Sequence, residues 1–112
     1  MASPVKEIVT AQYAPNSQTT LYVSAAGVTT RIDKLTVTNT DTVTQTISIN
    51  LVPSGGSAGG SNLTTDLQAI LAGATWNSPN EYGHYLNPGD FISVIASVAS
   101  KLVIAVGGTQ VS

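Results

Sequence analysis

The side chains best suited to chemistry are gathered between positions 76 and 85. This stretch holds the only tryptophan and the only histidine of the chain, together with Glu81 and two of its four tyrosines. An imidazole can act as a general base toward a serine or ligate a metal ion. Aromatic rings that carry a polar group are enriched at protein interfaces, and they also offer a flat face to sugar rings. The candidate residues are Trp76, Tyr82, His84 and Tyr85.

The pattern around these residues does not predict catalysis. A serine nucleophile would depend on His84 as its base, yet no serine occurs in a Gly-x-Ser-x-Gly setting. The six carboxylates are isolated from one another along the chain, and the absence of cysteine excludes disulfides and thiolate metal sites. The glycine-rich segment 54–61 lacks the Gly-Lys-Ser/Thr ending of a phosphate-binding loop. We therefore expect no enzyme, and no catalytic, cofactor-binding or metal-ligating residues.

The aromatic residues leave three interpretations open. Trp76 and one tyrosine can close the end of a hydrophobic core, which is a purely structural role. The same side chains can form a protein interface, or they can form a sugar-binding platform. An exposed Trp76 flanked by tyrosines would favour the sugar platform, and a buried one would count against it.

Charge is unusually scarce in this chain of 112 residues. It has four Lys/Arg and six Asp/Glu, so 9% of its residues are charged, against about 25% in an average soluble domain. The expected surface of roughly 5,800 Å² therefore carries roughly one charge per 580 Å². Either this surface is a threonine-rich neutral one that is simply solvated, or much of it is covered by partners, which we favour. A net charge of −2 argues against nucleic-acid binding. No apolar run is long enough for a membrane span, and the N-terminus lacks a signal-peptide core.

The clearest structural pattern runs through residues 35–52. Even positions from Thr36 to Asn50 are polar, whereas most odd positions from Leu35 to Leu51 are apolar. This alternation predicts strands with one buried and one solvated face. The apolar face is interrupted at residues 39–42, where Asn-Thr-Asp-Thr predicts a hairpin turn. Ile32 has the opposite parity to Leu35, and a bulge near Asp33 and Lys34 would reconcile them.

Further strands are expected on both sides of this segment. Residues 5–13 form a weak edge strand, so segment 1–12 is either an N-terminal arm or an edge strand. A short strand covers 20–24, a central strand covers 91–98, and a hairpin through Ala99 and Ser100 leads into 101–106. Asn87-Pro88-Gly89-Asp90 predicts a turn. The apolar spacing over 63–74 fits a short helix near 64–72 or an extended segment.

These elements predict an all-β fold. Seven to eight short strands with frequent turns are typical of an antiparallel β-sandwich or a jelly-roll-like arrangement. No linker or repeat divides the chain, so we expect a single domain over residues 1–112.

Three stretches together resemble small β-sandwich virion proteins of tailed bacteriophages. They are residues 32–41, residues 47–58 with the glycine-rich loop, and residues 86–94 with the Pro-Gly turn before a core strand. The resemblance covers roughly residues 20–110. It includes cement or decoration proteins of the capsid as well as neck and tail accessory proteins, and it carries no catalytic residues.

The resemblance implies a non-enzymatic structural protein on the capsid surface that cements neighbouring capsomers. Its partners would be the major capsid protein or other virion proteins, together with further copies of this chain, and neither nucleic acid nor membrane. The alternatives are a neck or tail accessory protein and a carbohydrate-binding module of the tail. The expected contact residues are Val5, Ile8, Trp76, Tyr82, His84 and Tyr85.

Overall fold

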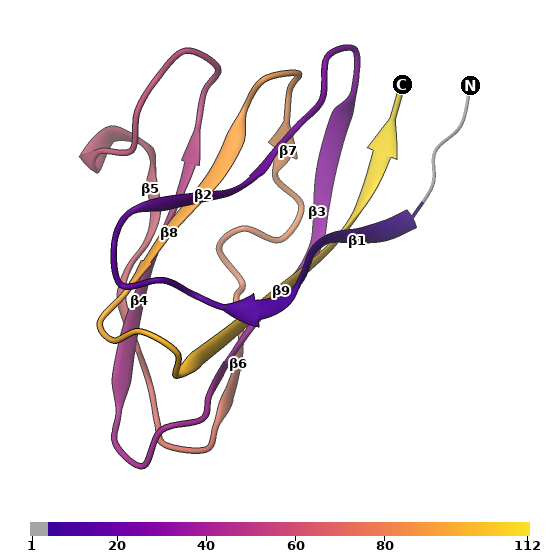
Figure 1. Cartoon of the computed structure of the whole chain (residues 1–112). Helices are drawn as coiled ribbons and strands as arrows, with labels where there is room; N and C mark the ends of the chain where they lie inside the picture. Colours follow the sequence, from indigo (N-terminus) through magenta and orange to yellow (C-terminus); the bar gives the residue numbers. More distant parts are fainter. Residues whose placement is uncertain (1–4) are drawn as a thin grey trace.

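Two antiparallel sheets pack face to face in this protein (Figure 1). The structure, a computed structural model, describes residues 5–112. Sheet A contains β1 (Val5–Tyr13), β9 (Leu102–Val111), β3 (Thr29–Asn39) and β6 (Thr75–Asn77) in that order, and β7 (Tyr85–Leu86) also pairs with β3. Sheet B has the order β2 (Thr19–Val23), β8 (Phe91–Ala96), β4 (Gln45–Val52) and β5 (Leu63–Ile70). A single 3-10 turn, η1 (Gly60–Asn62), is the only helical element in residues 5–112.

The order of the strands is that of a jelly roll. Because β6 and β7 both pair with β3, they act as one interrupted edge strand, and each sheet then has four strands. Every connection passes from one sheet to the other except the β4–β5 connection and the short excursion between β6 and β7. Two interleaved Greek keys produce this connectivity. The expected all-β antiparallel sandwich is confirmed.

The core lies between the sheets and is built by the alternation in residues 35–52. Leu35 and Val37 of β3 face Ile47 and Ile49 of β4, and all four side chains are buried as expected. Leu51 is only half-buried, although it packs against the same core. The remaining core is aliphatic, with buried side chains that include Ile32, Ile70, Leu86, Ile92, Val94, Leu102, Ile104 and Val106.

The polar face of β4 is less exposed than its sequence predicts. Ser48 and Asn50 are both buried, because β4 lies between β8 and β5 and the 53–62 loop folds back over its end. The Asn50 Nδ2 atom donates hydrogen bonds to the Gly59 carbonyl at 3.0 Å and to Asn62 Oδ1 at 2.7 Å. The loop therefore supplies the partners that solvent would supply on an open face.

The bulge expected near Asp33 is present in β3. Ile32 pairs with Gly108 and Lys34 pairs with Gly107, so the pairing register shifts between these two positions. One extra residue reverses the facing of the strand, which puts both Ile32 and Leu35 into the core.

Two expected hairpins are instead crossings between the sheets. The chain does turn after Asn39, but it leaves β3 of sheet A and enters β4 of sheet B. The Asn39 side chain is buried and holds this crossing, donating to the carbonyls of Val43 and Ile70 at 2.9 Å. Likewise, the tight connection at Ala99 and Ser100 joins β8 of sheet B to β9 of sheet A. Turn residues mark where the direction reverses, but long-range packing decides which sheet receives the next strand.

The helix considered for residues 64–72 is not formed. Residues 63–70 form strand β5, in which Leu67 has a φ of 49° at a bulge opposite Ile47 and Ile49. Leu67 and Leu71 are exposed, so the apolar residues at helical spacing do not share one buried face. A turn over residues 71–74 follows β5, and in it the Ala74 amide donates to the Leu71 carbonyl at 3.0 Å.

Strand β1 lies at the edge of sheet A, next to β9. Ile8 and Val9 are consecutive yet both buried, because the β1–β9 register shifts on either side of Val9. Residues 5–13 are thus an edge strand that contributes to the core. Any arm formed by residues 1–4 lies outside the described residues. No helix within the described part of the chain is long and apolar enough to span a membrane.

Substitutions at Ile49 test this assignment of the core. We expect Ile49→Val to lower the free energy of unfolding by about 0.5–1.5 kcal/mol. Ile49→Asp should prevent folding, because it buries an unpaired charge. Val23→Asp, at an exposed position on β2, is the matched control and should change stability little. Urea unfolding followed by circular dichroism measures all three, and a folded Ile49→Asp variant would contradict the assignment.

Candidate functional site

The described residues contain no catalytic constellation. His84 is exposed on a turn, and no serine hydroxyl in residues 5–112 is hydrogen-bonded to its imidazole. The same residues contain no cluster of three or more side chains of the histidine, cysteine, aspartate and glutamate types that could hold a metal ion.

The aromatic residues are positioned by a tight turn over residues 81–84. The His84 amide donates to the Glu81 carbonyl at 3.1 Å, and Gly83 has a φ of 81°, which a side chain would disfavour. The turn is fixed to β3 through Ile32, whose carbonyl accepts from Gly83 N at 2.7 Å and whose amide donates to the His84 carbonyl at 2.9 Å. Tyr82 lies within this turn and Tyr85 directly follows it, so both stand on a backbone held by hydrogen bonds.

Glu81 anchors the turn to the opposite sheet. Its side chain is fully buried, and its carboxyl group accepts hydrogen bonds from three hydroxyl groups. Thr64 and Thr65 of β5 both donate to Oε2 at 2.7 Å, and Ser78 donates to Oε1. The edge of sheet A formed by β6 and β7 is thereby tied to the β5 edge of sheet B.

The sequence analysis did not identify this role of Glu81. Its partners on β5 lie more than a dozen positions away in the chain, and that segment also fitted a helix. The local signal was a serine three residues before a glutamate, which by itself indicates only a turn or cap.

The six expected contact residues are placed in different environments. Tyr82, His84 and Tyr85 are exposed, with 67% of Tyr82 and 64% of Tyr85 accessible to solvent. Trp76 pairs with Val37, is half-buried and packs against the core, which counts against a platform built on this ring. The Ile8 side chain belongs to the core, so it can contact a partner only if β1 leaves the sheet. The side chain of Val5 lies outside the described part of the chain.

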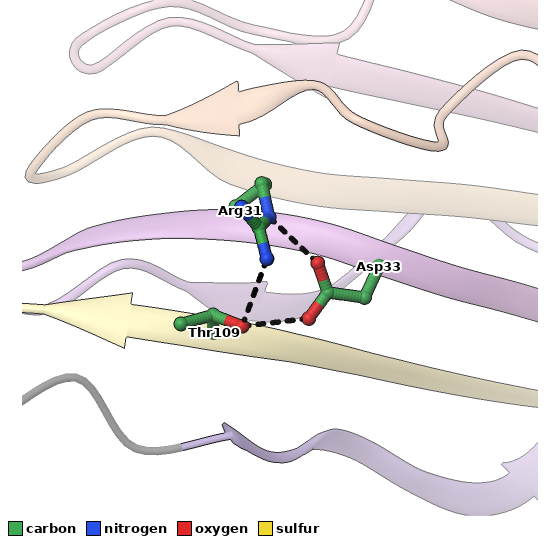
Figure 2. A network of polar contacts seen from close by, with 3 residues as sticks. All are labelled: Arg31, Asp33 and Thr109. Atoms are coloured by element: carbon green, nitrogen blue, oxygen red, sulfur yellow. Dashed lines mark hydrogen bonds and ion pairs between the residues drawn. The ribbon is translucent and has the colours of Figure 1, made fainter.

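A polar network on the outer face of sheet A adjoins the two tyrosines. Arg31 Nε donates to Asp33 Oδ1 at 2.7 Å, and Thr109 Oγ1 donates to Asp33 Oδ2 at 2.7 Å (Figure 2). A longer contact of 3.4 Å joins Arg31 Nη2 to the Thr109 hydroxyl. Arg31 pairs across the sheet with Thr109 on one side and with Tyr85 on the other, so the three form one row.

This network shifts the pKa values of both charged groups. The pKa of Asp33 is lowered, first by the hydrogen bond from Thr109 and then by that from Arg31. The pKa of Arg31 is raised, mainly by Asp33, with smaller contributions from Tyr85 and Tyr82. The guanidinium group therefore lies within electrostatic reach of both phenols. Arg31, Tyr82, Tyr85 and Thr109 are called the tyrosine patch below.

An open pocket of about 390 Å³ lies beside the patch, at one end of the sandwich. It is bordered by the end of β4, the start of β5, the 84–86 segment and Asp90 before β8. Its lining consists of Leu51, Val52, Pro53, Ser61, Asn62, Leu63, Thr64, His84, Tyr85, Leu86 and Asp90. The sequence analysis did not identify this pocket, because its wall combines four segments that are separate in the chain.

Two side chains hold the pocket wall in place. Asp90 accepts from Ser54 N and from Asn87 N, both at 2.9 Å, and so joins the 53–62 loop to the expected turn at residues 87–90. In that turn Gly89 has a φ of 89°, and a side chain there would collide with Ser54. Asn62 ties the loop to itself and to β4 through Ser57, Gly59 and Asn50.

Known proteins do not assign a function to this geometry. Comparisons with protein-family models, with curated proteins and with solved structures found no match for the chain.

Replacement of Glu81 tests its role as an anchor. Glu81→Ala removes the acceptor of three hydroxyl groups. The Thr64 hydroxyl can still donate to the Ile49 carbonyl, but the buried hydroxyls of Thr65 and Ser78 lose their acceptor, and each buried group left unpaired costs about 1–3 kcal/mol. We expect a loss of at least about 2 kcal/mol in the free energy of unfolding, and faster amide hydrogen exchange at Gly83 and His84. Glu7→Ala, at an exposed position, is the control and should stay within about 0.5 kcal/mol of the native protein. Equal stability of the two variants would contradict the anchoring role.

The lowered pKa of Asp33 predicts a small acid-sensitive contribution to stability. Its pKa in the folded protein lies below the ordinary value of 3.8, so the ionised form favours folding. The contribution is fully present above that ordinary value and is lost as the pH falls through the folded pKa. It is small because solvent screens the exposed pair.

Acid titration of unfolding checks the Asp33 contribution. Asp33→Asn should be less stable than the native protein at neutral pH, and the difference should shrink in strong acid. Thr109→Val removes the hydrogen bond that lowers the pKa of Asp33 most. In a Thr109→Val background, Asp33→Asn should therefore cost less stability at neutral pH. If the stability of the native protein and of Asp33→Asn changed with pH in parallel, the expected contribution of Asp33 would be contradicted.

Proposed function

We propose that this protein is a non-enzymatic structural protein of a bacteriophage particle, bound to the capsid exterior, where it bridges neighbouring capsomers. The tyrosine patch is the observation that carries this proposal. The jelly roll adds support by analogy, since this architecture recurs in viral capsid domains and in lectins. The phage resemblance of residues 32–41, 47–58 and 86–94 agrees with it.

The tyrosine patch has the composition of a binding surface. Tyrosine and arginine are enriched among residues that contribute most to binding energy. Tyr82 and Tyr85 are exposed, yet their backbone is held by the Glu81 anchor and by the hydrogen bonds to Ile32. A surface that is already ordered loses less conformational entropy when it binds. Arg31 is held by Asp33, so its guanidinium group is also oriented in advance.

The rest of the surface is suited to contacts that do not depend on charge. The chain has ten charged side chains, and one of them, Glu81, is buried. A standard protein interface buries about 1,600 Å². A protein that binds only the assembled lattice stabilises that lattice by mass action, without any chemical step. In this proposal the contact area, repeated over the shell, reinforces the capsid.

The neck or tail of the particle is the one alternative to a position on the capsid exterior. A neck or tail accessory protein would use the same neutral surface and the same patch. Imaging of an intact virion, with this chain fitted to the density, distinguishes a capsid location from a neck or tail location and also gives the symmetry of any homo-oligomer.

Truncation of Tyr82 tests the contact. We expect Tyr82→Ala to weaken binding to capsids that lack the native protein by about 2 kcal/mol or more, or roughly 30-fold in Kd. Val43→Ala is the control, because Val43 is also exposed but lies in the β3–β4 connection, beyond the end of β3 that is farther from Arg31. Occupancy is measured by quantifying the protein on purified capsids.

Two results would contradict this proposal. Equal occupancy by Tyr82→Ala and Val43→Ala would remove the patch from the contact. Loss of native binding between low and high salt would show that the contact depends on charge, because salt screens exposed charges.

A further inference from the structure

We infer that the pocket beside the tyrosine patch is a binding site for a neutral saccharide. The pocket shares Tyr85 with the tyrosine patch, but most of its lining comes from β4, η1 and β5. The inference stands on the size, lining, charge and rigidity of the pocket.

The size and lining suit a sugar ring. A volume of about 390 Å³ lies within the usual range for small-molecule sites, which is about 300–1,000 Å³. Leu51, Pro53 and Leu63 provide an apolar part of the lining, to which the exposed ring of Tyr85 also belongs. A pyranose has an apolar face and a circumference of hydroxyl groups, so it needs both kinds of surface.

The polar groups of the pocket retain hydrogen-bonding capacity. The Asp90 carboxylate accepts two backbone hydrogen bonds, which leaves about two of its four lone-pair sites for a ligand. His84 is exposed within the lining, and Ser61, which is also exposed, lies on the 3-10 turn η1. The Asp90 carboxylate can accept hydrogen bonds from sugar hydroxyls. The Ser61 hydroxyl and the His84 imidazole can both donate hydrogen bonds to them and accept hydrogen bonds from them.

The charge of the lining selects among polar ligands. The eleven lining residues include one carboxylate and one imidazole but neither lysine nor arginine. Binding of a phosphate or another anion needs cationic donors or a set of backbone amides aimed at it. A neutral polyhydroxylated ligand is the class that fits an apolar wall with an acceptor-rich rim.

The pocket is also preformed. Asp90 and Asn62 fix the two ends of the 53–62 loop, and the Glu81 anchor fixes the segment that carries His84 and Tyr85. A small ligand therefore loses little of its binding free energy to ordering the protein.

Titration with single sugars tests the inference. The probes are glucose, galactose, mannose and N-acetylglucosamine, each added to the 15N-labelled full chain, with inorganic phosphate as the anionic probe. We expect at least one sugar to give saturable amide shifts confined to the residues around Asn62, His84 and Asp90. The expected Kd is on the order of 1 mM, because so small a ligand has few atoms to contribute.

Two pairs of variants make the test specific. Ser61→Trp fills the pocket and should abolish the shifts, whereas Ser57→Trp places the same ring elsewhere on the loop and should leave them unchanged. Tyr85→Ala should weaken binding at least tenfold, whereas Tyr82→Ala, which removes an equally exposed ring outside the lining, should not.

Three outcomes overturn the inference. They are the absence of saturable shifts with every sugar, equal binding by Ser61→Trp and Ser57→Trp, and displacement of the sugar by inorganic phosphate. None of them bears on the capsid contact, because Tyr82→Ala tests that contact by occupancy on capsids.

Discussion

The carboxyl group of Glu81 closes one side of the sandwich, and the position of the tyrosine patch depends on it. Along this side the edges of the two sheets share no backbone pairing, and three hydroxyl groups converge on one buried side chain instead. A buried polar network stabilises a structure only when all its members are paired. Within residues 5–112, every buried side-chain nitrogen and oxygen has a hydrogen-bond partner. The turn that carries Tyr82, the adjoining Tyr85 and one wall of the pocket are therefore held from inside the protein.

The sequence predicted the features that depend on neighbouring residues. The alternation from Leu35 to Ile49 and the change of parity at Ile32 are local patterns, and both match the structure. The same holds for the turn at Asn87-Pro88-Gly89-Asp90, because proline and glycine restrict the backbone wherever they occur.

Features that depend on distant partners were not predictable in this way. The turn at Asn39 was expected to form a hairpin, but its side chain bonds to Ile70, which no local pattern reveals. Strand β5 has the apolar spacing of a helix, and its pairing with β4 overrides that spacing. The candidate contact residues were found by residue type, so the list combined exposed tyrosines with Ile8 and Trp76, which the packing turns inward.

The bulge in β3 has a consequence for chain length. Ile32, Lys34 and Leu35 pair with Gly108, Gly107 and Val106, which are consecutive, so Asp33 is the one residue that the register does not need. Loss of a single residue at position 33 or 34 would leave a regular strand with Ile32 and Leu35 still facing inward. The same loss between Leu35 and Asn39 would exchange the two faces of the strand. Strand β3 thus contains one place where a single-codon deletion can occur without disturbing the core, and only the polar network around Arg31 would change with it.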